Sequence, residues 1–570
     1  MRTTQKKTFY SIVSVILSFL PALSIIVGVK LQVQFSIFIG LSLLAIIYFT
    51  LVFFSNKIKC SLMIFIITLT SLTISLSYEL ISNYPLGEDV HTEYRVIEES
   101  LRAGSFNPLN RSGGYIPQYY YEIFSFILSS VFLSNVTGLT MIEIIKFVWN
   151  GLIIGLIITV VFIYCQKLSN IKLSALAGCL LIMAQSTYVT TLHSTSKQAI
   201  SLFILVIIAL FLLKFLENKG SARSTSLALI LLILGFSGYH YLVSGIFVAL
   251  SVLALAVLTF IQPFLRTPPQ PVNSTFKPVN LTLILTVIWF LWYFLLTGSI
   301  IRPAVDFVEG LILLQKKPYS YEAINIPLST YLNYLRLSIN GIITITILLA
   351  GLNAFINLLK RTGNFLDSLI VNASFLFLIL LISEITGYST LGVGRLSIIF
   401  MIIVSPYFYS AFNTVFSRIL MRRKHLILLF LVFVLNIRLL LSIGVLPYAT
   451  GSVENSVFLD PTYKFEASIV DSDLKSAHFI SKHVSKATIC ADLKAENVFC
   501  YVQDSGSIAL INRYSINNAN NRYITYFGSF NLVRTKVILR VGEFSNATKL
   551  LEAYMLKLRI YDNGYALAFC

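Results

Sequence analysis

Long apolar segments with almost no charge recur along the first 450 residues of the chain. Segments of about twenty residues match a bilayer core of about 30 Å, and they lack the period-two alternation of a transmembrane β-barrel. Helices are then the structure that satisfies the backbone in lipid. The pattern predicts about thirteen spans, near residues 8–28, 33–54, 60–80, 142–164, 172–190, 197–216, 224–238, 240–262, 280–299, 337–358, 367–386, 395–417 and 425–445.

Polar stretches interrupt the pattern near 81–118 and 300–336, and the chain beyond about 450 has ordinary charge density. In that last part the periodicity predicts two helices and two strands, over Asp473–Val484, Ala547–Leu556, Lys486–Ala491 and Val537–Arg540. We therefore expect an all-α polytopic membrane protein with a small C-terminal α/β or α+β domain. Its expected parts are three N-terminal helices (1–80), a first outer loop with interfacial helices (81–141), a helix bundle (142–449) and a soluble extracytoplasmic domain (450–570).

Lysine and arginine gather in alternate short loops, which predicts the orientation of the chain. The basic side holds Arg2, Lys6, Lys7, Lys57, Lys59, Lys167, Lys172, Lys214, Lys219, Arg223, Lys360, Arg361, Arg418, Arg422, Arg423 and Lys424. The N-terminus is then cytoplasmic and the C-terminal domain lies outside the plasma membrane. Tyr119–Leu139 would invert every later loop if it crossed, so we interpret it as an interfacial or re-entrant helix.

Composition supports the membrane assignment and limits the function classes. The chain is 56% hydrophobic and 12% charged, with a net charge of +18, whereas a soluble domain carries about 25% charged residues. A soluble enzyme is excluded, and the positive charge indicates one basic membrane face rather than nucleic-acid binding. Cys60, Cys165 and Cys179 are interpreted as small core residues, while Cys490 and Cys500 could form a disulfide in an outer domain.

The first outer loop concentrates titratable groups in a chain that uses charge sparingly. Glu88, Asp89, His91 and Glu93 fall within six residues. Apolar positions at helical spacing predict a helix that starts near Val90 and lies along the membrane surface, with Asp89 at its N-cap. Such carboxylates can act as a general base or hold a divalent metal. Capping and the helix dipole alone also favour acids at this position.

Three short motifs resemble a known family. Gly87, Asp89, Glu93 and Tyr94 form a Gly-x-Asp-x-x-x-Glu-Tyr pattern before a short helix; Gly-Tyr-His-Tyr occupies 238–241 and Tyr-Asp-Asn-Gly 561–564. Together they resemble the GT-C superfamily of membrane glycosyltransferases, and more closely an uncharacterised archaeal family of membrane proteins within it. Three predicted spans precede the loop here, where that superfamily usually has one.

The resemblance implies a polyprenyl-phosphate-linked sugar donor and transfer at the outer membrane face. Asp89 would be the base towards the acceptor hydroxyl and Glu93 a metal or acceptor ligand, with Glu88 a weaker candidate. Some members of the superfamily bind a metal through carboxylates, so Asp89 and Glu93 would be candidate ligands for Mg²⁺ or Mn²⁺.

Cations and histidines on outward loops are candidates for binding a donor phosphate or an acceptor. They are His91, His193, His240, Arg302, Arg336 and Arg395. Arg395 follows a Gly-Val-Gly turn that permits close approach to a phosphate, and it also fits an arginine that snorkels at a helix start. His240, between two tyrosines, equally fits an interfacial aromatic belt.

Two other functions fit the same pattern. A transporter or lipid-linked glycan flippase would place ionisable residues deep within several spans. A glycan polymerase or ligase would use arginine and histidine of a later outer loop instead of Asp89. The expected partners in every case are membrane lipids and a lipid-linked glycan, with a glycan, lipid or protein as acceptor.

Overall fold

The computed structural model describes most of the apolar part of the chain and short pieces of the C-terminal part. The described residues are 19–106 without 30, 32, 56 and 88; 120–188 without 121 and 186; 192–216; 222–261; 278–297; 330–360; 364–385; 393–419; 424–450; 471–483; 498; and the strands named below.

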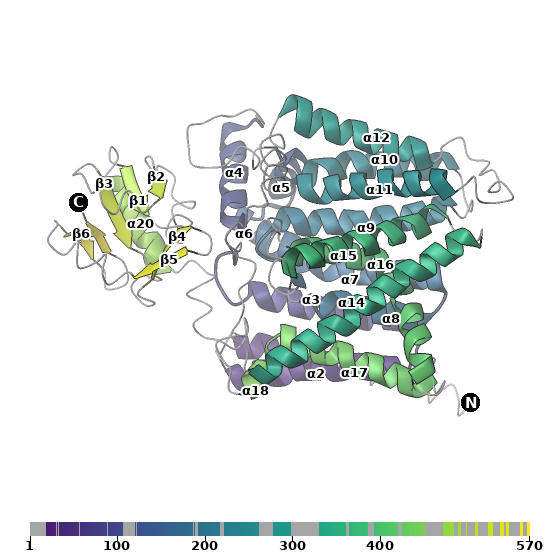
Figure 1. The fold of residues 1–570 in the computed structure, drawn as a ribbon. Coiled ribbons are helices and arrows are strands. Elements are labelled where there is room, and N and C mark those ends of the chain that lie inside the picture. The colour runs from purple at the N-terminus through teal and green to yellow at the C-terminus, as the bar shows by residue number, and fades with distance from the viewer. Residues whose placement is uncertain are drawn as a thin grey trace.

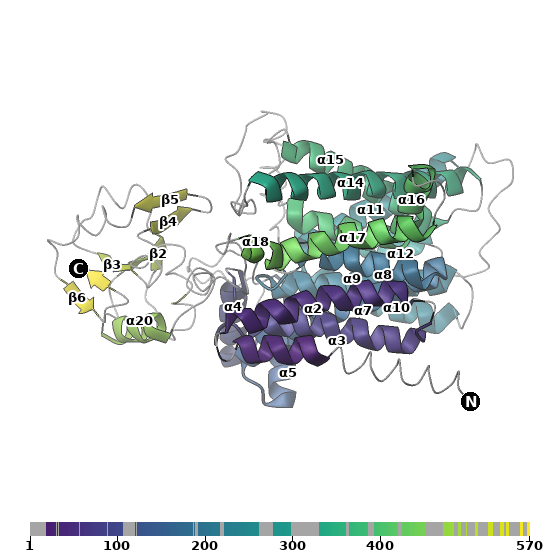
Figure 2. The same ribbon diagram turned by 90° about the horizontal axis from the view of Figure 1, so that it is seen from below.

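The apolar segments form a bundle of helices that run side by side (Figures 1 and 2). Apolar side chains on several faces explain this arrangement, because such helices must pack on one another or face lipid. The N-terminal half contains α2 (Gln34–Phe53), α3 (Cys60–Glu79), α5 (Phe124–Thr137), α6 (Met141–Glu143), the π-helix η2 (Ile144–Ile153), α7 (Ile154–Ser169), α8 (Lys172–Met183) and α9 (Ser196–Leu216). The remainder contains α10 (Ala222–Tyr239), α11 (Tyr241–Ile261), α12 (Pro278–Phe290), the π-helix η5 (Leu291–Leu296), α14 (Thr330–Leu359), α15 (Phe365–Ile385), α16 (Val393–Ile419), α17 (Lys424–Ser442) and α18 (Val445–Ala449).

The prediction of a polytopic helical membrane protein is confirmed. Among the described residues, nine helices are long and apolar enough to cross a membrane, and each overlaps a predicted span. Shorter apolar helices occupy four further predicted spans, at Phe19–Val29, Lys172–Met183, Ser224–Tyr239 and Leu429–Ser442. Large apolar side chains such as Leu283, Leu295 and Phe375 are exposed on the bundle, as a lipid-facing surface requires. The total of thirteen spans stays a prediction.

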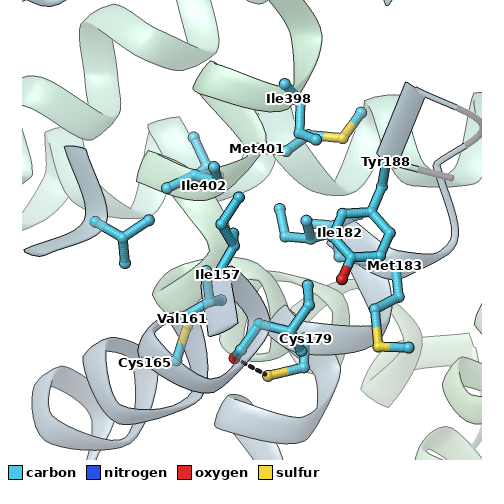
Figure 3. Close-up of a cluster of buried hydrophobic side chains, with 14 of the residues drawn as sticks. Ile157, Val161, Cys165, Cys179, Ile182, Met183, Tyr188, Ile398, Met401 and Ile402 are labelled. Atoms are coloured by element: carbon cyan, nitrogen blue, oxygen red, sulfur yellow. Dashed lines mark hydrogen bonds between the residues drawn. The ribbon is translucent and has the colours of Figure 1, made fainter. Parts of the chain in front are cut away.

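The centre of the bundle is a close-packed apolar core in which α7, α8 and α16 meet (Figure 3). Ile157 and Val161 from α7 lie beside Ile182 and Met183 from α8, and Ile402 comes from α16. The prediction that cysteines serve here as small core residues is confirmed for two of them. Cys165 and Cys179 are fully buried and free, and the Cys179 thiol donates to the Ile158 carbonyl oxygen at 3.4 Å.

The predicted surface helix is α4 (Asp89–Ala103), which lies across the ends of the bundle helices (Figure 1). It begins at Asp89, one residue before the predicted start, so Asp89 lies in the first turn rather than at the cap. The segment interpreted as interfacial contains α5, whose 14 residues span only about 21 Å at 1.5 Å per residue. A helix of that length is short for a bilayer core of about 30 Å.

The two ends of the bundle carry different polar groups. At the end opposite α4, the Lys172 ammonium donates to the Ile58 carbonyl oxygen at 2.8 Å, and the Cys60 thiol donates to Gln166 Oε1 at 2.8 Å. The basic loops near Lys57 and Lys167, which the sequence places on one side, therefore share this end. The buried carboxylates described below lie at the α4 end.

Beyond α18 the structure describes helix α20 (Asp471–His483) and seven short strands (Figure 1). They are β1 (Thr488–Ala491), β2 (Ile508–Leu510), β3 (Tyr523–Phe527), β4 (Lys536–Arg540), β5 (Glu543–Asn546), β6 (Arg559–Asp562) and β7 (Leu567–Phe569). Strands β2, β1 and β3 are parallel, and β7 and β6 continue the sheet antiparallel in the order β2-β1-β3-β7-β6. Strands β4 and β5 form a separate hairpin.

This region agrees with three of its four predicted elements. Helix α20 and strands β1 and β4 cover the predicted helix at 473–484 and the predicted strands at 486–491 and 537–540. The predicted helix over 547–556 and residue Cys500, half of the suggested disulfide with Cys490, lie outside the described residues.

Candidate functional site

The first turn of α4 places a partly exposed carboxylate at the end of the bundle. Asp89 Oδ1 accepts a hydrogen bond from the Tyr120 hydroxyl at 2.8 Å. The rest of α4 is amphipathic, with Val90, Val96 and Ile97 buried against the bundle. Burial of this apolar face holds the helix against the ends of the bundle helices, so its N-terminus has a fixed position relative to them.

A close backbone approach ties the start of α4 to the loop before α9. The Val90 amide donates to the Ser194 carbonyl oxygen at 3.1 Å. Gly87 has φ +114°, and a Cβ atom there would overlap Ser194. Only glycine has both the permitted backbone conformation and the missing side chain that this approach requires. The first residue of the Gly-x-Asp pattern therefore fixes Asp89 relative to the 192–195 loop.

Glu93, one turn further along α4, points into the protein. It is fully buried, its Oε2 accepts a hydrogen bond from the Ser196 amide at 3.1 Å, and its Oε1 lies 3.6 Å from Lys197 Nζ. Burial raises the pKa of Glu93 to about 7; Lys197 opposes this rise and the Asp89 carboxylate adds to it. Lys197 Nζ also lies 3.6 Å from the centre of the Tyr120 ring. Glu93, Lys197, Tyr120 and Asp89 thus form one continuous group.

A second set of contacts extends this group below α4. Ser196 Oγ donates to Asn150 Oδ1 at 2.8 Å, and Asn150 Nδ2 donates to the His193 carbonyl oxygen at 2.9 Å. Asn150 belongs to η2, and π-helical turns are rare and frequent at functional sites. Lys146, four residues earlier in η2, donates to the Ser82 carbonyl oxygen at 2.5 Å.

The network ends in a buried acid–histidine pair. Glu79, the last residue of α3, lies 2.9 Å from His193 Nδ1, and both side chains are fully buried. The Tyr78 ring stacks on the His193 ring with centroids 4.3 Å apart. In the described part of the chain His193 Nε2 has no hydrogen-bond partner. We call the whole group the polar cluster: Glu79, Asp89, Glu93, Tyr120, Lys146, Asn150, His193, Ser196 and Lys197.

An apolar cavity of about 390 Å³ adjoins the same segment that carries Tyr120. The Trp292 indole N–H donates to the Glu122 carbonyl oxygen at 2.9 Å, and the Phe124 and Trp292 rings lie 4.5 Å apart. The cavity is lined by Phe124, Leu234, Gly235, Ser237, Ile288, Leu291, Trp292 and Leu296. Its walls therefore suit a hydrocarbon chain. Phe124 in this lining follows Tyr120, the hydrogen-bond partner of Asp89, by four residues.

The predicted Mg²⁺ or Mn²⁺ site at Asp89 and Glu93 stays a prediction. Among the described residues, no group of three or more His, Cys, Asp and Glu side chains could hold a metal ion. Both oxygens of Glu93 already face protein groups, the Ser196 amide and the Lys197 ammonium. A divalent cation at Glu93 Oε1 would have to displace the Lys197 ammonium.

The structure brings together three of the predicted site residues and separates others. Asp89, Glu93 and His193 belong to the polar cluster, and His91 is buried in α4. His240 instead caps α11, because its Nδ1 accepts hydrogen bonds from the Leu242 and Val243 amides at 3.1 and 3.4 Å. Its ring also stacks on Tyr241, as in the aromatic-belt interpretation.

The predicted arginines lie elsewhere or beyond the described part. Arg336 lies near the start of α14 and does not belong to the polar cluster. Arg395 lies in the first turn of α16, but its side chain is outside the described residues, as are Glu88 and Arg302.

Sequence reasoning missed several members of the polar cluster. Glu79 and Lys146 look like ordinary charges at span ends, and Asn150 and Tyr120 carry no motif. One signal was available: Lys197 is one of the few basic residues on the sparsely charged side, and a cation there needs a partner. Comparison with known proteins adds no family to this picture, since no protein-family model matches the chain and no curated protein matches its sequence.

Proposed function

We propose that the protein is an integral membrane glycosyltransferase that moves a sugar from a polyprenyl-phosphate donor to a cell-surface glycan, lipid or protein. One observation carries this proposal. The segment Tyr120–Phe124 positions Asp89 at one end and lines the apolar cavity at the other. A partly exposed carboxylate whose hydrogen-bond partner lies four residues from the lining of an apolar cavity suits a substrate with a lipid tail and a polar head. The Gly-x-Asp-x-x-x-Glu-Tyr resemblance to GT-C enzymes supports the sugar as the transferred group.

The proposed reaction needs a base but no covalent intermediate. The acceptor hydroxyl oxygen attacks the anomeric carbon of the donor, and Asp89 takes the hydroxyl proton as the new bond forms. The bond between the anomeric carbon and the phosphate oxygen breaks, and its electron pair leaves with the lipid phosphate. The Tyr120 hydroxyl, which donates to Asp89 Oδ1, fixes the carboxylate in position for this step.

Glu93 and Lys197 serve as positioning residues in this proposal. The buried carboxylate holds the Lys197 ammonium against the face of the Tyr120 ring, where the cation is favoured by the ring quadrupole. Lys197 in turn keeps a positive charge beneath the site at which a phosphate leaves with its negative charge. Preorganised charge of this kind is an established source of transition-state stabilisation.

The finer topology belongs to the same proposal. Thirteen spans put the N-terminus and the basic loops in the cytoplasm and α4 at the outer face of the plasma membrane. The C-terminal residues 450–570 then form an extracytoplasmic domain. This arrangement places the polar cluster on the side where lipid-linked sugars are used for cell-surface glycans.

The test is transfer of radiolabelled sugar from native polyprenyl-phosphate donors by detergent-solubilised membranes with matched protein levels. Wild type is expected to transfer label and Asp89→Asn to lose it. If wild type transfers label and Asp89→Asn keeps full activity, Asp89 is not the base. The polymerase or ligase hypothesis, which uses a later outer loop, is then favoured. Added EDTA in the same assay tests the predicted need for Mg²⁺ or Mn²⁺.

A transporter is the second candidate, because the polar cluster buries more ionisable groups than the sequence suggested. Glu79, Lys146 and Lys197 are all nearly or fully buried, as in proton relays of transporters. All three lie at span ends rather than at mid-membrane, which favours the enzyme. Solubilised protein distinguishes the two, since transfer survives without a sealed compartment and transport does not.

A further inference from the structure

The pair of Glu79 and His193 takes no part in the proposed reaction, yet His193 belongs to the turn on which α4 rests. This turn spans residues 192–195 and is closed by a hydrogen bond from the Thr195 amide to the Leu192 carbonyl oxygen at 3.4 Å. It leads directly into α9. Neighbouring residues of so short a turn move together, so a side chain that fixes one of them fixes the others.

The residue after His193 holds the start of α4. The Val90 amide donates to the Ser194 carbonyl oxygen at 3.1 Å, and Gly87 approaches Ser194 so closely that an added Cβ atom would overlap it. Asp89 lies between these two contacts in the chain. Its carboxylate therefore moves with the turn, and a displacement of about 1 Å in a reacting group can reduce a rate about 100-fold.

Three contacts hold His193 to helices in the body of the bundle. Its Nδ1 lies 2.9 Å from Glu79 Oε1 at the end of α3, and its ring stacks on the Tyr78 ring with centroids 4.3 Å apart. Its carbonyl oxygen accepts a hydrogen bond from Asn150 Nδ2 of η2 at 2.9 Å. The two helices are themselves joined, because the Ser75 hydroxyl donates to the Asn150 carbonyl oxygen at 2.5 Å. The turn is thus anchored to a connected pair of bundle helices.

The contact between Glu79 and His193 is the side-chain hydrogen bond of this anchor. Both side chains are fully buried. A proton shared between a carboxyl group and an imidazole makes a strong and directional hydrogen bond, which the low dielectric of a buried site strengthens. Removal of either group leaves the other buried without its partner, a state that movement of the turn would relieve.

The Nδ1 atom of His193, rather than Nε2, makes this contact. Within the described part of the chain Nε2 has no hydrogen-bond partner, and the side chain has no exposed surface. A ring without exposed surface is not placed to touch a substrate. The effect of His193 on Asp89 therefore passes through the turn.

We propose that Glu79 and His193 are positioning residues for Asp89. The pair fixes the 192–195 turn on α3, the turn fixes the first turn of α4, and the first turn of α4 sets the place of the carboxylate. The effect on α4 is independent of any reaction, whereas the effect on a rate rests on the proposed glycosyl transfer.

The first experiment is hydrogen exchange of the full-length protein in detergent, because the Val90 amide reports the docking of α4. His193→Ala removes the imidazole, and His193→Asn keeps a side-chain N–H close to the position of Nδ1. Glu79→Gln keeps an acceptor oxygen and the shape of the side chain, and it serves if His193→Ala does not fold. Tyr407→Phe is the matched control, since it removes a hydrogen bond to the Asp367 carboxylate between α15 and α16, at 2.6 Å.

His193→Ala is expected to raise the exchange rate at Val90 about tenfold or more, because the turn loses its side-chain hydrogen bond to α3. His193→Asn should stay within about threefold of wild type, and Glu79→Gln should lie between the two, because a neutral acceptor forms a weaker hydrogen bond. Tyr407→Phe should leave Val90 unchanged. Wild-type exchange at Val90 in both His193→Ala and Glu79→Gln overturns the proposal.

The second experiment is the radiolabel transfer assay on the same proteins, with amounts matched after size-exclusion chromatography. A positioning role lowers kcat about tenfold or more in His193→Ala and leaves KM for donor and acceptor within about twofold. His193→Asn should recover most of the rate, and Tyr407→Phe should retain it. A raised KM that His193→Asn does not correct means that the imidazole itself binds substrate, and this result overturns the positioning role.

The proposed function and the positioning role fail in different ways. If wild type transfers no sugar but exchange at Val90 responds as expected, the proposed function fails and the link from the pair to α4 stands. If wild type transfers sugar and exchange at Val90 does not respond, the proposed function stands and the positioning role is wrong.

Discussion

Asp89 and Asp367 both lie in the first turn of a helix, where a carboxylate is favoured by the helix dipole. Both carboxylate oxygens of Asp367 form hydrogen bonds that stabilise the fold. Its Oδ2 accepts a hydrogen bond from the Asn364 amide at 2.8 Å, while Asn364 Oδ1 accepts one from the Asp367 amide at 3.3 Å. Its Oδ1 accepts from the Tyr407 hydroxyl at 2.6 Å. Asp367 is thus a buried cap that also ties α15 to α16.

Asp89 occupies the same kind of helix position in different surroundings. It is partly exposed, and the surrounding group joins Glu93 of the same helix with Tyr120 and Lys197 from two other parts of the chain. The comparison shows that helix position alone does not separate a cap from a reactive group. A reactive carboxylate is distinguished from a cap by its access to a substrate and by other ionisable groups close to it.

The largest expected effect is on sugar transfer, where the two aspartates should differ most. Asp89→Asn is expected to reduce the transfer rate at least about 100-fold, because the asparagine amide is too weak a base to take the proton of the acceptor hydroxyl. Asp367→Asn makes the same chemical change in the opposite end of the bundle and should leave the rate per folded molecule within about twofold. The measurement is the radiolabel assay with protein quantified after size-exclusion chromatography. Equal losses in both variants would mean that transfer reports folding rather than the base.

A smaller effect is expected when the position of Asp89 is disturbed without touching its chemistry. Gly87→Ala places a Cβ atom against Ser194 in a backbone conformation with positive φ, which should cost about 2–4 kcal/mol in the docking of α4. Gly104→Ala is the matched control, since its φ is also positive (+60°) but nothing lies within 4 Å of the added Cβ. Hydrogen exchange of α4 amides should increase in Gly87→Ala only. Similar exchange in both variants would remove the fixed link between α4 and the 192–195 loop.

Substitution of Asp367 should lower the stability of the protein more than substitution of Asp89, which is the reverse of the order expected for sugar transfer. Asp367→Ala removes a reciprocal cap and the Tyr407 hydrogen bond, which should lower stability by about 1–2 kcal/mol. Asp89→Ala removes one hydrogen bond at a partly exposed site and should cost about half as much or less. Thermal unfolding of the purified proteins in detergent provides the comparison. A larger loss for Asp89→Ala would identify Asp89 as the main structural cap.

The contrast also explains which parts of the molecule the sequence predicts. Spans are set by local apolar length, and α4 by local periodicity, so both could be read from neighbouring residues. Strands β1 and β4 and helix α20 were likewise predicted from the periodicity of neighbouring residues. For this reason, the nine long helices of the described residues each overlap a predicted span.

The polar cluster could be predicted only in part, because its contacts join distant segments. Glu79 pairs with His193 across 114 residues, and Glu93 accepts from Ser196 across 103 residues. Periodicity within a segment carries no information on which span ends meet. The titratable density of the first loop identified Asp89 and Glu93. Tyr120 was found only through its hydrogen bond to Asp89, and Asn150 and Lys146 only through the packing of η2 against α3 and α9.

The smallest expected effect concerns Glu93 and pH. Burial raises the pKa of Glu93 in the folded protein from 4.5 to about 7, so the fold favours the protonated acid. The resulting stability is fully present below pH 4.5 and is lost as the pH rises through 7. Wild type should lose about 1 kcal/mol of stability between about pH 6 and about pH 8.

Glu93→Gln should remove this pH-dependent loss, because the amide does not ionise. Glu99→Gln is the control on the same helix, where Glu99 forms a surface ion pair with Arg95 at 2.7 Å. Chemical unfolding at several pH values measures the slope for each protein. If wild type and Glu93→Gln have the same slope, Glu93 is ionised throughout this range, held so by Lys197. Glu93 and Lys197 would then form a permanent ion pair. Asp89 would be the carboxylate of the polar cluster that remains able to take the proton of the acceptor hydroxyl.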